Sequence, residues 1–244
     1  MAKKAPNTAA DALAEIEATG DRVADWAASN AALILGVIAG LLVLAAAGGF
    51  YIQHASDSRD AAADALAIAT SQYRQAMGAD PTTGGPVVEP ANAELAERTR
   101  TEYAERFASL GQAHAGTAAG ALAWLEAGRL QAELGRLEEA AASFISARGA
   151  AGESAVGALA SLRIAALAEN RGDDQAAAEA FERAATVEAY PLRAAALGEA
   201  ARCWVAAAQP ERALAAYQRL EAEYPDELVA PHIASLIGEL RLSQ

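Results

Sequence analysis

The stretch from Ala31 to Ile52 constrains the fold of this chain more than any other, because it contains no charged residue. A helix of this length rises about 33 Å, close to the hydrocarbon thickness of a bilayer. Only a helix lets a single such segment satisfy its backbone hydrogen bonds in lipid. Trp26 precedes the stretch and Phe50–Tyr51 end it, as expected for aromatic residues at membrane interfaces. The stretch therefore predicts a transmembrane helix over residues 31–52.

Two other interpretations of this stretch compete with a transmembrane helix. A cleaved signal peptide has a short basic leader and a small-residue cleavage site, which Ala45–Ala47 would supply. The leader here is acidic on balance, with five acidic and three basic residues before Ala31. A buried core helix rarely runs to this length without a polar face. A retained membrane anchor explains the pattern better than either.

The residues before the anchor predict an acidic N-terminal tail, 1–30, in which apolar residues recur at the spacing of an amphipathic helix. Its basic residues, Lys3, Lys4 and Arg22, favour a cytoplasmic N-terminus. We therefore expect a single-pass protein of the bacterial inner membrane with a periplasmic C-terminal domain.

Small residues lie on one face of the predicted transmembrane helix. Ala32, Gly36 and Gly40 recur every four residues. Small residues let two helix backbones approach closely in lipid. This face is predicted to pack against the spanning helix of a membrane protein partner.

Composition favours an all-α C-terminal domain. The chain is rich in alanine and poor in β-branched and aromatic residues, which favours helix over strand. After residue 52 it has 16 arginines, no lysine and 27 acidic residues. An acidic domain repels nucleic acid, so no nucleic-acid partner is expected. A single cysteine, Cys203, excludes an intramolecular disulfide.

A repeat of aromatic residues organises this domain. Phe107, Phe144, Phe181 and Tyr217 are spaced 37, 37 and 36 residues apart. An alanine precedes each of the last three by four residues, at Ala140, Ala177 and Ala213. Self-similarity at this period predicts stacked helix pairs, because one pair cannot bury its apolar face alone.

The predicted layout after the anchor has three parts. A membrane-proximal helix pair, 53–110, consists of helices over Ala55–Met77 and Asn92–Leu110, separated by a Pro/Gly-rich loop, 78–90. Three repeats follow over 111–225, and a capping helix ends the chain over 226–244.

The repeats resemble the tetratricopeptide-repeat family. Trp124-x2-Ala127-Gly128-x2-Gln131, followed by Ala140-x3-Phe144, is similar to the family pattern W-x2-L-G-x2-Y…A-x3-F. The chain departs from that pattern where Gln131, Ala168 and Trp204 replace the usual tyrosine. The resemblance implies an α-solenoid of helix hairpins.

One membrane helix followed at once by helical repeats resembles the ancillary subunit of the bacterial Sec translocon, the YfgM-like family. The part most similar to it is DRVADWAASNAALILGVIAG, residues 21–40. The resemblance implies a scaffold beside the translocon that contacts periplasmic chaperones.

The sequence contains no catalytic, cofactor-binding or metal-binding motif, so we expect a protein that is not an enzyme. His54, His114 and His232 are far apart and lack ligand spacing. Two alternatives are a structural subunit of another envelope complex, for secretion or motility, and a membrane-bound enzyme whose site no motif reveals.

In tetratricopeptide domains the first helices of successive pairs line a groove that takes a peptide or helix of a soluble partner. Transferred by the repeat alignment, that groove comprises Leu125, Arg129, Leu162, Ala166, Gly198 and Arg202. Arg129 and Arg202 occupy equivalent positions and are predicted to bind carboxylates of the partner. In the opposing interpretation they pair with glutamates of this chain, and the leucines pack within the solenoid.

Overall fold

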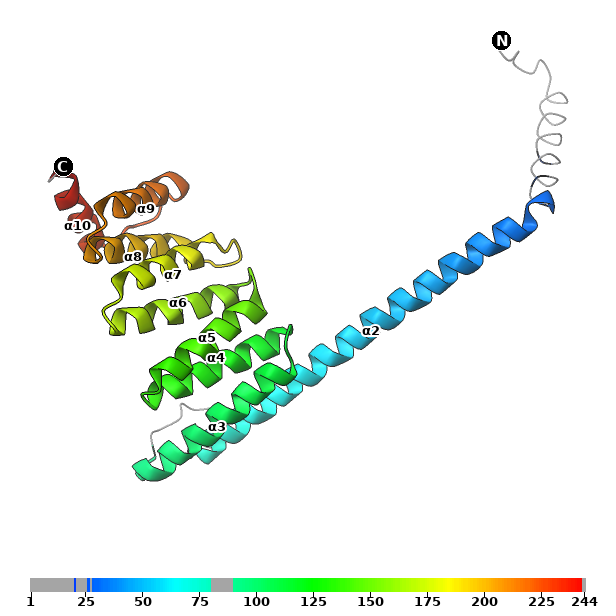
Figure 1. The fold of residues 1–244 in the computed structure, drawn as a ribbon, viewed down its shortest axis with the longest axis horizontal. Helices are drawn as coiled ribbons and strands as arrows, with labels where there is room; N and C mark the ends of the chain where they lie inside the picture. Colours follow the sequence, from blue (N-terminus) through cyan, green and yellow to red (C-terminus); the bar gives the residue numbers. More distant parts are fainter. Residues whose placement is uncertain (1–19, 21–25, 27, 80–89, 243–244) are drawn as a thin grey trace, which may run out of the picture. The chain divides into compact units, whose positions relative to one another are not determined.

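The structure is a computed structural model that describes residues 20, 26, 28–79 and 90–242, except for several side chains within 31–55. The chain divides into two compact units, Met1–Asp57 and Ser58–Gln244. The described residues form helices and no strand, which confirms the all-α prediction (Figure 1).

Helix α2, Ala31–Ala76, contains the apolar stretch of the sequence. The stretch is not a separate element, because α2 continues without interruption for 46 residues. Among the described residues, no helix is both long enough and apolar enough to cross a membrane, so the predicted span over 31–52 is not supported. Most of the predicted tail, 1–30, and loop, 78–90, lies outside the described residues.

The second unit contains the remaining helices, which follow one another through short connections. Their bounds are α3 Ala93–Ala113, α4 Ala118–Glu133, α5 Leu137–Ala151, α6 Ala155–Asn170, α7 Asp174–Thr186, α8 Arg193–Ala206, α9 Pro210–Glu223 and α10 Pro231–Leu242. From α3 to α9 each helix packs against the next, and α10 packs on α8 and α9 (Figure 1). This arrangement is a stack of helix hairpins.

The same turn joins the two helices of each hairpin. Its central residue has a positive φ, at Gly135 (74°), Gly172 (71°) and Ala208 (55°). The next residue's N–H bonds to a carbonyl five residues earlier, as from Arg136 to Gln131 at 2.8 Å. This Schellman pattern satisfies carbonyls at the end of the first helix. Gly78 closes α2 with an equivalent turn, at φ 87°.

The repeated aromatic residues form the core of the stack. Phe107, Phe144, Phe181 and Tyr217 are all buried. Phe144, for example, shares a cluster with Ala140 of its own helix and with Ala160 and Leu167 of α6 in the next hairpin. The aromatic position therefore joins one hairpin to the next.

The C-terminal part of α2 packs with α3 as a further pair. The rings of Tyr73 and Tyr103 have centroids 5.4 Å apart, and those of Tyr103 and Phe107 6.3 Å apart. Ala127 and Leu130 of α4 belong to the same buried cluster. The stack thus begins within α2.

Polar contacts repeat between successive hairpins. Arg136 donates to the Thr101 hydroxyl at 3.1 Å, and one hairpin later Arg171 donates to the Leu137 carbonyl at 3.0 Å. Gln209 donates to Gln175 at 3.0 Å in the next hairpin. These contacts join residues 34 or 35 positions apart, slightly less than the 36- or 37-residue repeat.

Candidate functional site

The first helices of three successive hairpins present an aligned surface, which we call the first-helix face. On each helix it consists of four residues spaced by four, three and four positions, which places them on one side of the helix. They are Leu122, Glu126, Arg129 and Glu133 of α4; Leu159, Arg163, Ala166 and Asn170 of α6; and Ala195, Glu199, Arg202 and Ala206 of α8. Each is exposed or half-buried.

On α4 and α8, the arginines of this face bind glutamates of the chain itself. Arg129 donates to Glu126 at 2.8 Å and to Glu133 at 2.5 Å. Arg202 donates to Glu199 at 2.7 Å and also binds Glu169 of α6. Glu126 and Glu199 occupy equivalent positions, so the same Glu-x2-Arg pair recurs on both helices.

Helix α6 breaks this pattern. Arg163 stands at the position equivalent to Glu126 and Glu199, and Ala166 stands where Arg129 and Arg202 would be. Arg163 is exposed, and within the described part of the chain it makes no hydrogen bond, ion pair or ring contact. The middle helix therefore carries a cation that pairs with none of the described carboxylates.

A mainly apolar cavity lies at the α2 end of this face. It has a volume of about 680 Å³ and is lined by residues between 63 and 75 of α2, by Ala79 just after that helix, and by residues 118, 119 and 122 of α4. Most of the lining is alanine and leucine, including Leu66 and Leu122, and Arg74 is its one charged residue among those described. The volume falls within the range of ligand pockets.

A charged cavity of about 530 Å³ adjoins it, with Thr70 and Arg74 lining both. Arg129 lies 5.7 Å from the centre of the Tyr73 ring and Arg100 donates to Glu133 at 3.1 Å. Burial acts to lower the pKa of Arg129, but Glu126 and Glu133 outweigh it, so the pKa is raised. This guanidinium is fixed by internal partners.

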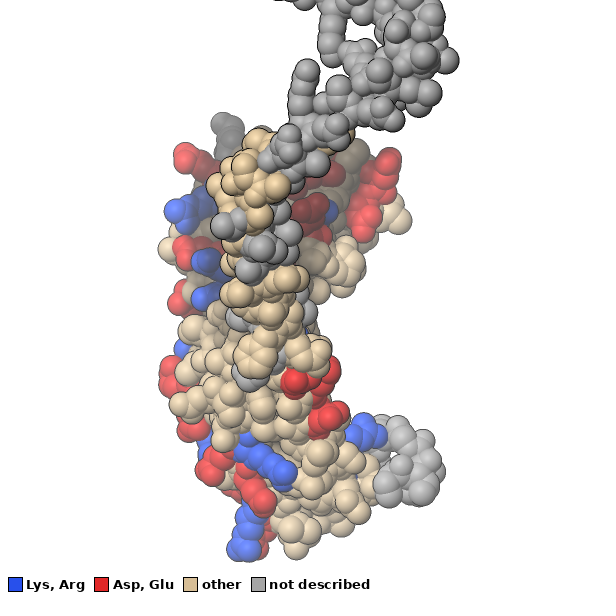
Figure 2. Space-filling view, turned by 90° about the vertical axis from the view of Figure 1, so that its right-hand side faces the viewer, with Lys and Arg blue, Asp and Glu red and all other residues tan. Residues whose placement is uncertain are grey.

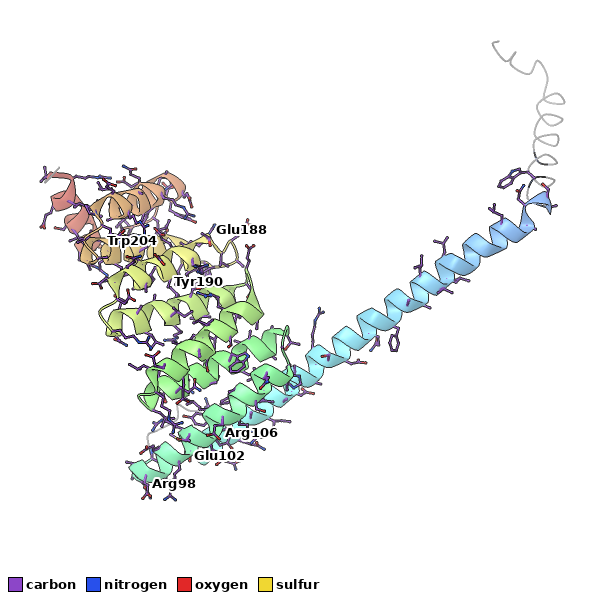
Figure 3. The ribbon with its side chains drawn as sticks, in the orientation of Figure 1. Arg98, Glu102, Arg106, Glu188, Tyr190 and Trp204 are labelled. Atoms are coloured by element: carbon purple, nitrogen blue, oxygen red, sulfur yellow. The ribbon has the colours of Figure 1, made fainter. Side chains whose placement is uncertain are left out.

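Charged side chains also cover the second helices. Arg98, Glu102 and Arg106 lie along α3 (Figure 3), and Arg98 binds Glu94 at 2.5 Å. In the space-filling view, acidic and basic side chains lie next to one another along the left edge and at the lower end, and acidic groups without basic neighbours lie on the right (Figure 2). The cavity beside α4, with mostly alanine and leucine in its lining, contrasts with this surface.

The structure distributes the predicted groove residues between core and surface. Leu125 is buried against Phe144, and Gly198 is buried, with Ile233 next to it. Leu162 is half-buried between two core clusters, whereas Arg129, Ala166 and Arg202 lie on the first-helix face. Partner binding by the groove stays a prediction.

Sequence reasoning missed Leu122, Leu159 and Arg163. The repeat alignment could have identified them: Leu159 is equivalent to Leu122, and Arg163 is equivalent to Glu126 and Glu199 but has the opposite charge.

The predicted membrane packing face lies in α2: Gly36 and Gly40 are exposed, with no described atom close to them, and the Ala32 side chain is not described.

The described residues contain no cluster of side chains that could hold a metal ion. Cys203 is fully buried, and burial raises the pKa of its thiol to about 12. Trp204 of α8 (Figure 3) donates to Glu182 at 2.8 Å and lies under the Arg212 guanidinium, 4.6 Å from the ring centre. These side chains have partners within the fold.

The fold and this face define an all-helical protein with a repeat-like stack of hairpins. No protein-family model matches the chain, and no curated protein matches it.

Proposed function

We propose that this chain is a protein–protein interaction scaffold in which the hairpin stack binds a segment of a partner. The observation that supports binding is the mainly apolar cavity of about 680 Å³ between α2 and α4. Leu122 and Leu159, 38% and 39% exposed, extend this apolar character along the first-helix face. Contiguous exposed apolar surface on a protein is typical of sites that a partner covers.

We also propose that the N-terminal half of α2 anchors the chain in a membrane. The support is the absence of charge over residues 31–52 and the exposure of Leu41, Leu42, Val43 and Leu44, each above 60%. Four consecutive helical residues point around the whole circumference, and a helix that is apolar on all sides belongs in lipid or in a protein interior.

The narrower proposal is an accessory subunit of the Sec translocon with a periplasmic second unit that contacts chaperones. Its support is the arrangement of one apolar helix followed directly by helical repeats, together with the resemblance to the YfgM-like family. The predicted face of Ala32, Gly36 and Gly40 would contact a spanning helix of the translocon.

Fractionation tests the anchor. The full chain, expressed in a bacterial host, is expected in the membrane pellet after alkaline carbonate extraction. The double variant L42D/V43D is expected to lose retention, because each buried charge costs about 2.5–3.5 kcal/mol at the centre of a membrane helix. Recovery of the native chain in the supernatant would contradict anchoring.

Cross-linking with mass spectrometry of solubilised membranes tests the partner. Translocon subunits and periplasmic chaperones are expected as neighbours. Neighbours from a secretion or motility complex would instead favour the alternative of a structural subunit there.

Protease protection of the second unit in intact spheroplasts tests the orientation: digestion from outside is expected.

A further inference from the structure

We propose that the first-helix face recognises a partner segment that carries an acidic side chain beside apolar ones: the carboxylate binds Arg163, and the apolar side chains contact Leu122, Leu159 and the cavity between α2 and α4. This inference rests on the proposed scaffold function and specifies its ligand.

The acidic character of the ligand follows from the charges on the face. Arg129 and Arg202 already bind two glutamates each within the chain, so a ligand carboxylate would have to displace them. Arg163 is exposed and makes no such contact among the described residues. An arginine of this kind can bind a carboxylate through two parallel hydrogen bonds.

The neighbour of Arg163 makes this position accessible. Ala166, one turn further along α6, is exposed and carries only a methyl group where α4 and α8 carry arginine. On α6, Arg163 replaces the glutamate of α4 and α8, and Ala166 replaces their arginine. Arg163 therefore has neither the internal partner nor the large neighbouring side chain found on those two helices. A ligand carboxylate can reach the guanidinium there without displacing a side chain.

The apolar part of the ligand follows from the same helix. Leu159 lies four residues before Arg163, so the two side chains share one face of α6. Leu122 holds the equivalent position on α4 and also lines the mainly apolar cavity. A segment that crosses α6 and α4 would therefore meet a cation and then apolar surface.

Site-specific photo-cross-linking of the full chain in its membrane tests the location. A benzophenone amino acid replaces Leu159 in one variant and Ile145 in the matched control; Ile145 of α5 is 50% exposed and lies outside the face. We expect a protein adduct from position 159 that is lost in the R163E background. The attached partner peptide, sequenced by mass spectrometry, should contain Asp or Glu next to apolar residues.

A synthetic peptide of the sequenced attachment site then tests the chemistry by fluorescence anisotropy. Binding should weaken about fivefold for R163E and about tenfold for Leu159→Ala. R183E is the charge control, because Arg183 is also exposed but lies on the second helix α7. Changing the peptide's acid to its amide should weaken binding to the native chain and leave binding to R163E unchanged.

The outcomes separate this inference from the scaffold proposal. An adduct from position 145 but not from 159, or equal binding of acidic and amide peptides, would overturn the inference and leave a scaffold. No adduct from either position would overturn both.

Discussion

A methyl group at Gly128 of α4 would lie 2.6 Å from Cε1 of Phe144 in α5, so the glycine lets the two helices of this hairpin approach. The equivalent residues in the next two hairpins, Ala165 and Ala201, are buried alanines. In this hairpin the aromatic ring therefore lies directly on the backbone of the opposing helix.

Gly128→Ala is expected to destabilise the second unit by about 1–3 kcal/mol, because overpacking forces the ring or the helix to shift. Denaturant unfolding of the full chain in detergent, followed by circular dichroism, measures this. Gly149→Ala in α5, where nothing lies within 4 Å, should instead stabilise by about 0.5–1 kcal/mol through helix propensity. Equal effects of the two substitutions would contradict the contact.

Ala208→Gly is expected to stabilise the hairpin of α8 and α9 by about 0.5–1 kcal/mol. Ala208 has φ 55°, a left-handed conformation that costs a residue with a Cβ about 1–2 kcal/mol. Gly135 and Gly172 hold the equivalent turns of the first two hairpins. Thermal melts compare this variant with Ala195→Gly, which lies inside α8 and should destabilise by about 1 kcal/mol. A lower melting temperature for Ala208→Gly would show that the turn is not strained.

Ser143→Ala is expected to cost about 1–3 kcal/mol, because it leaves a buried acceptor unpaired. The Ser143 hydroxyl donates to the Gln131 side chain at 2.6 Å, and both residues are buried. Ser146→Ala is the matched control, since among the described residues that hydroxyl bonds only the Ala142 carbonyl of its own helix. Urea midpoints that move equally for both variants would argue against the buried pair.

Cys203 is expected to resist alkylation in the folded chain at pH 8. Burial raises the pKa of its thiol from 9.0 to about 12, so almost no reactive thiolate is present. Iodoacetamide labelling should proceed only after unfolding, at a rate that mass spectrometry follows. Fast labelling under native conditions would mean that the end of the stack opens readily.

The same shift predicts a loss of stability in alkali. Below pH 9 the thiol is protonated in both the folded and the unfolded chain. Between pH 9 and 12 the unfolded thiol ionises first, so unfolding becomes more favourable as the pH rises. Cys203→Ala should lessen this dependence in denaturant titrations at successive pH values; an unchanged dependence would assign it to other groups.

Three of the predicted groove residues are buried or half-buried for a simple helical reason. Leu125, Leu162 and Gly198 each precede by one position the residues on the first-helix face, Glu126, Arg163 and Glu199. One residue turns an α-helix by about 100°, which is enough to exchange surface for core. Alanine occurs on every side of these helices, so their periodicity defines the buried side poorly.

The sequence alone determined the helical class, because alanine-rich segments favour helix without any distant contact. It also determined the period of the stack, because each hairpin must repeat the aromatic residue that the neighbouring hairpin covers. Tertiary structure decided which side of each first helix faces outward and which arginines are already bound. Those outcomes depend on contacts between residues about one repeat apart, such as Arg202 with Glu169. A side chain's partner across a hairpin is fixed only when the backbones have packed.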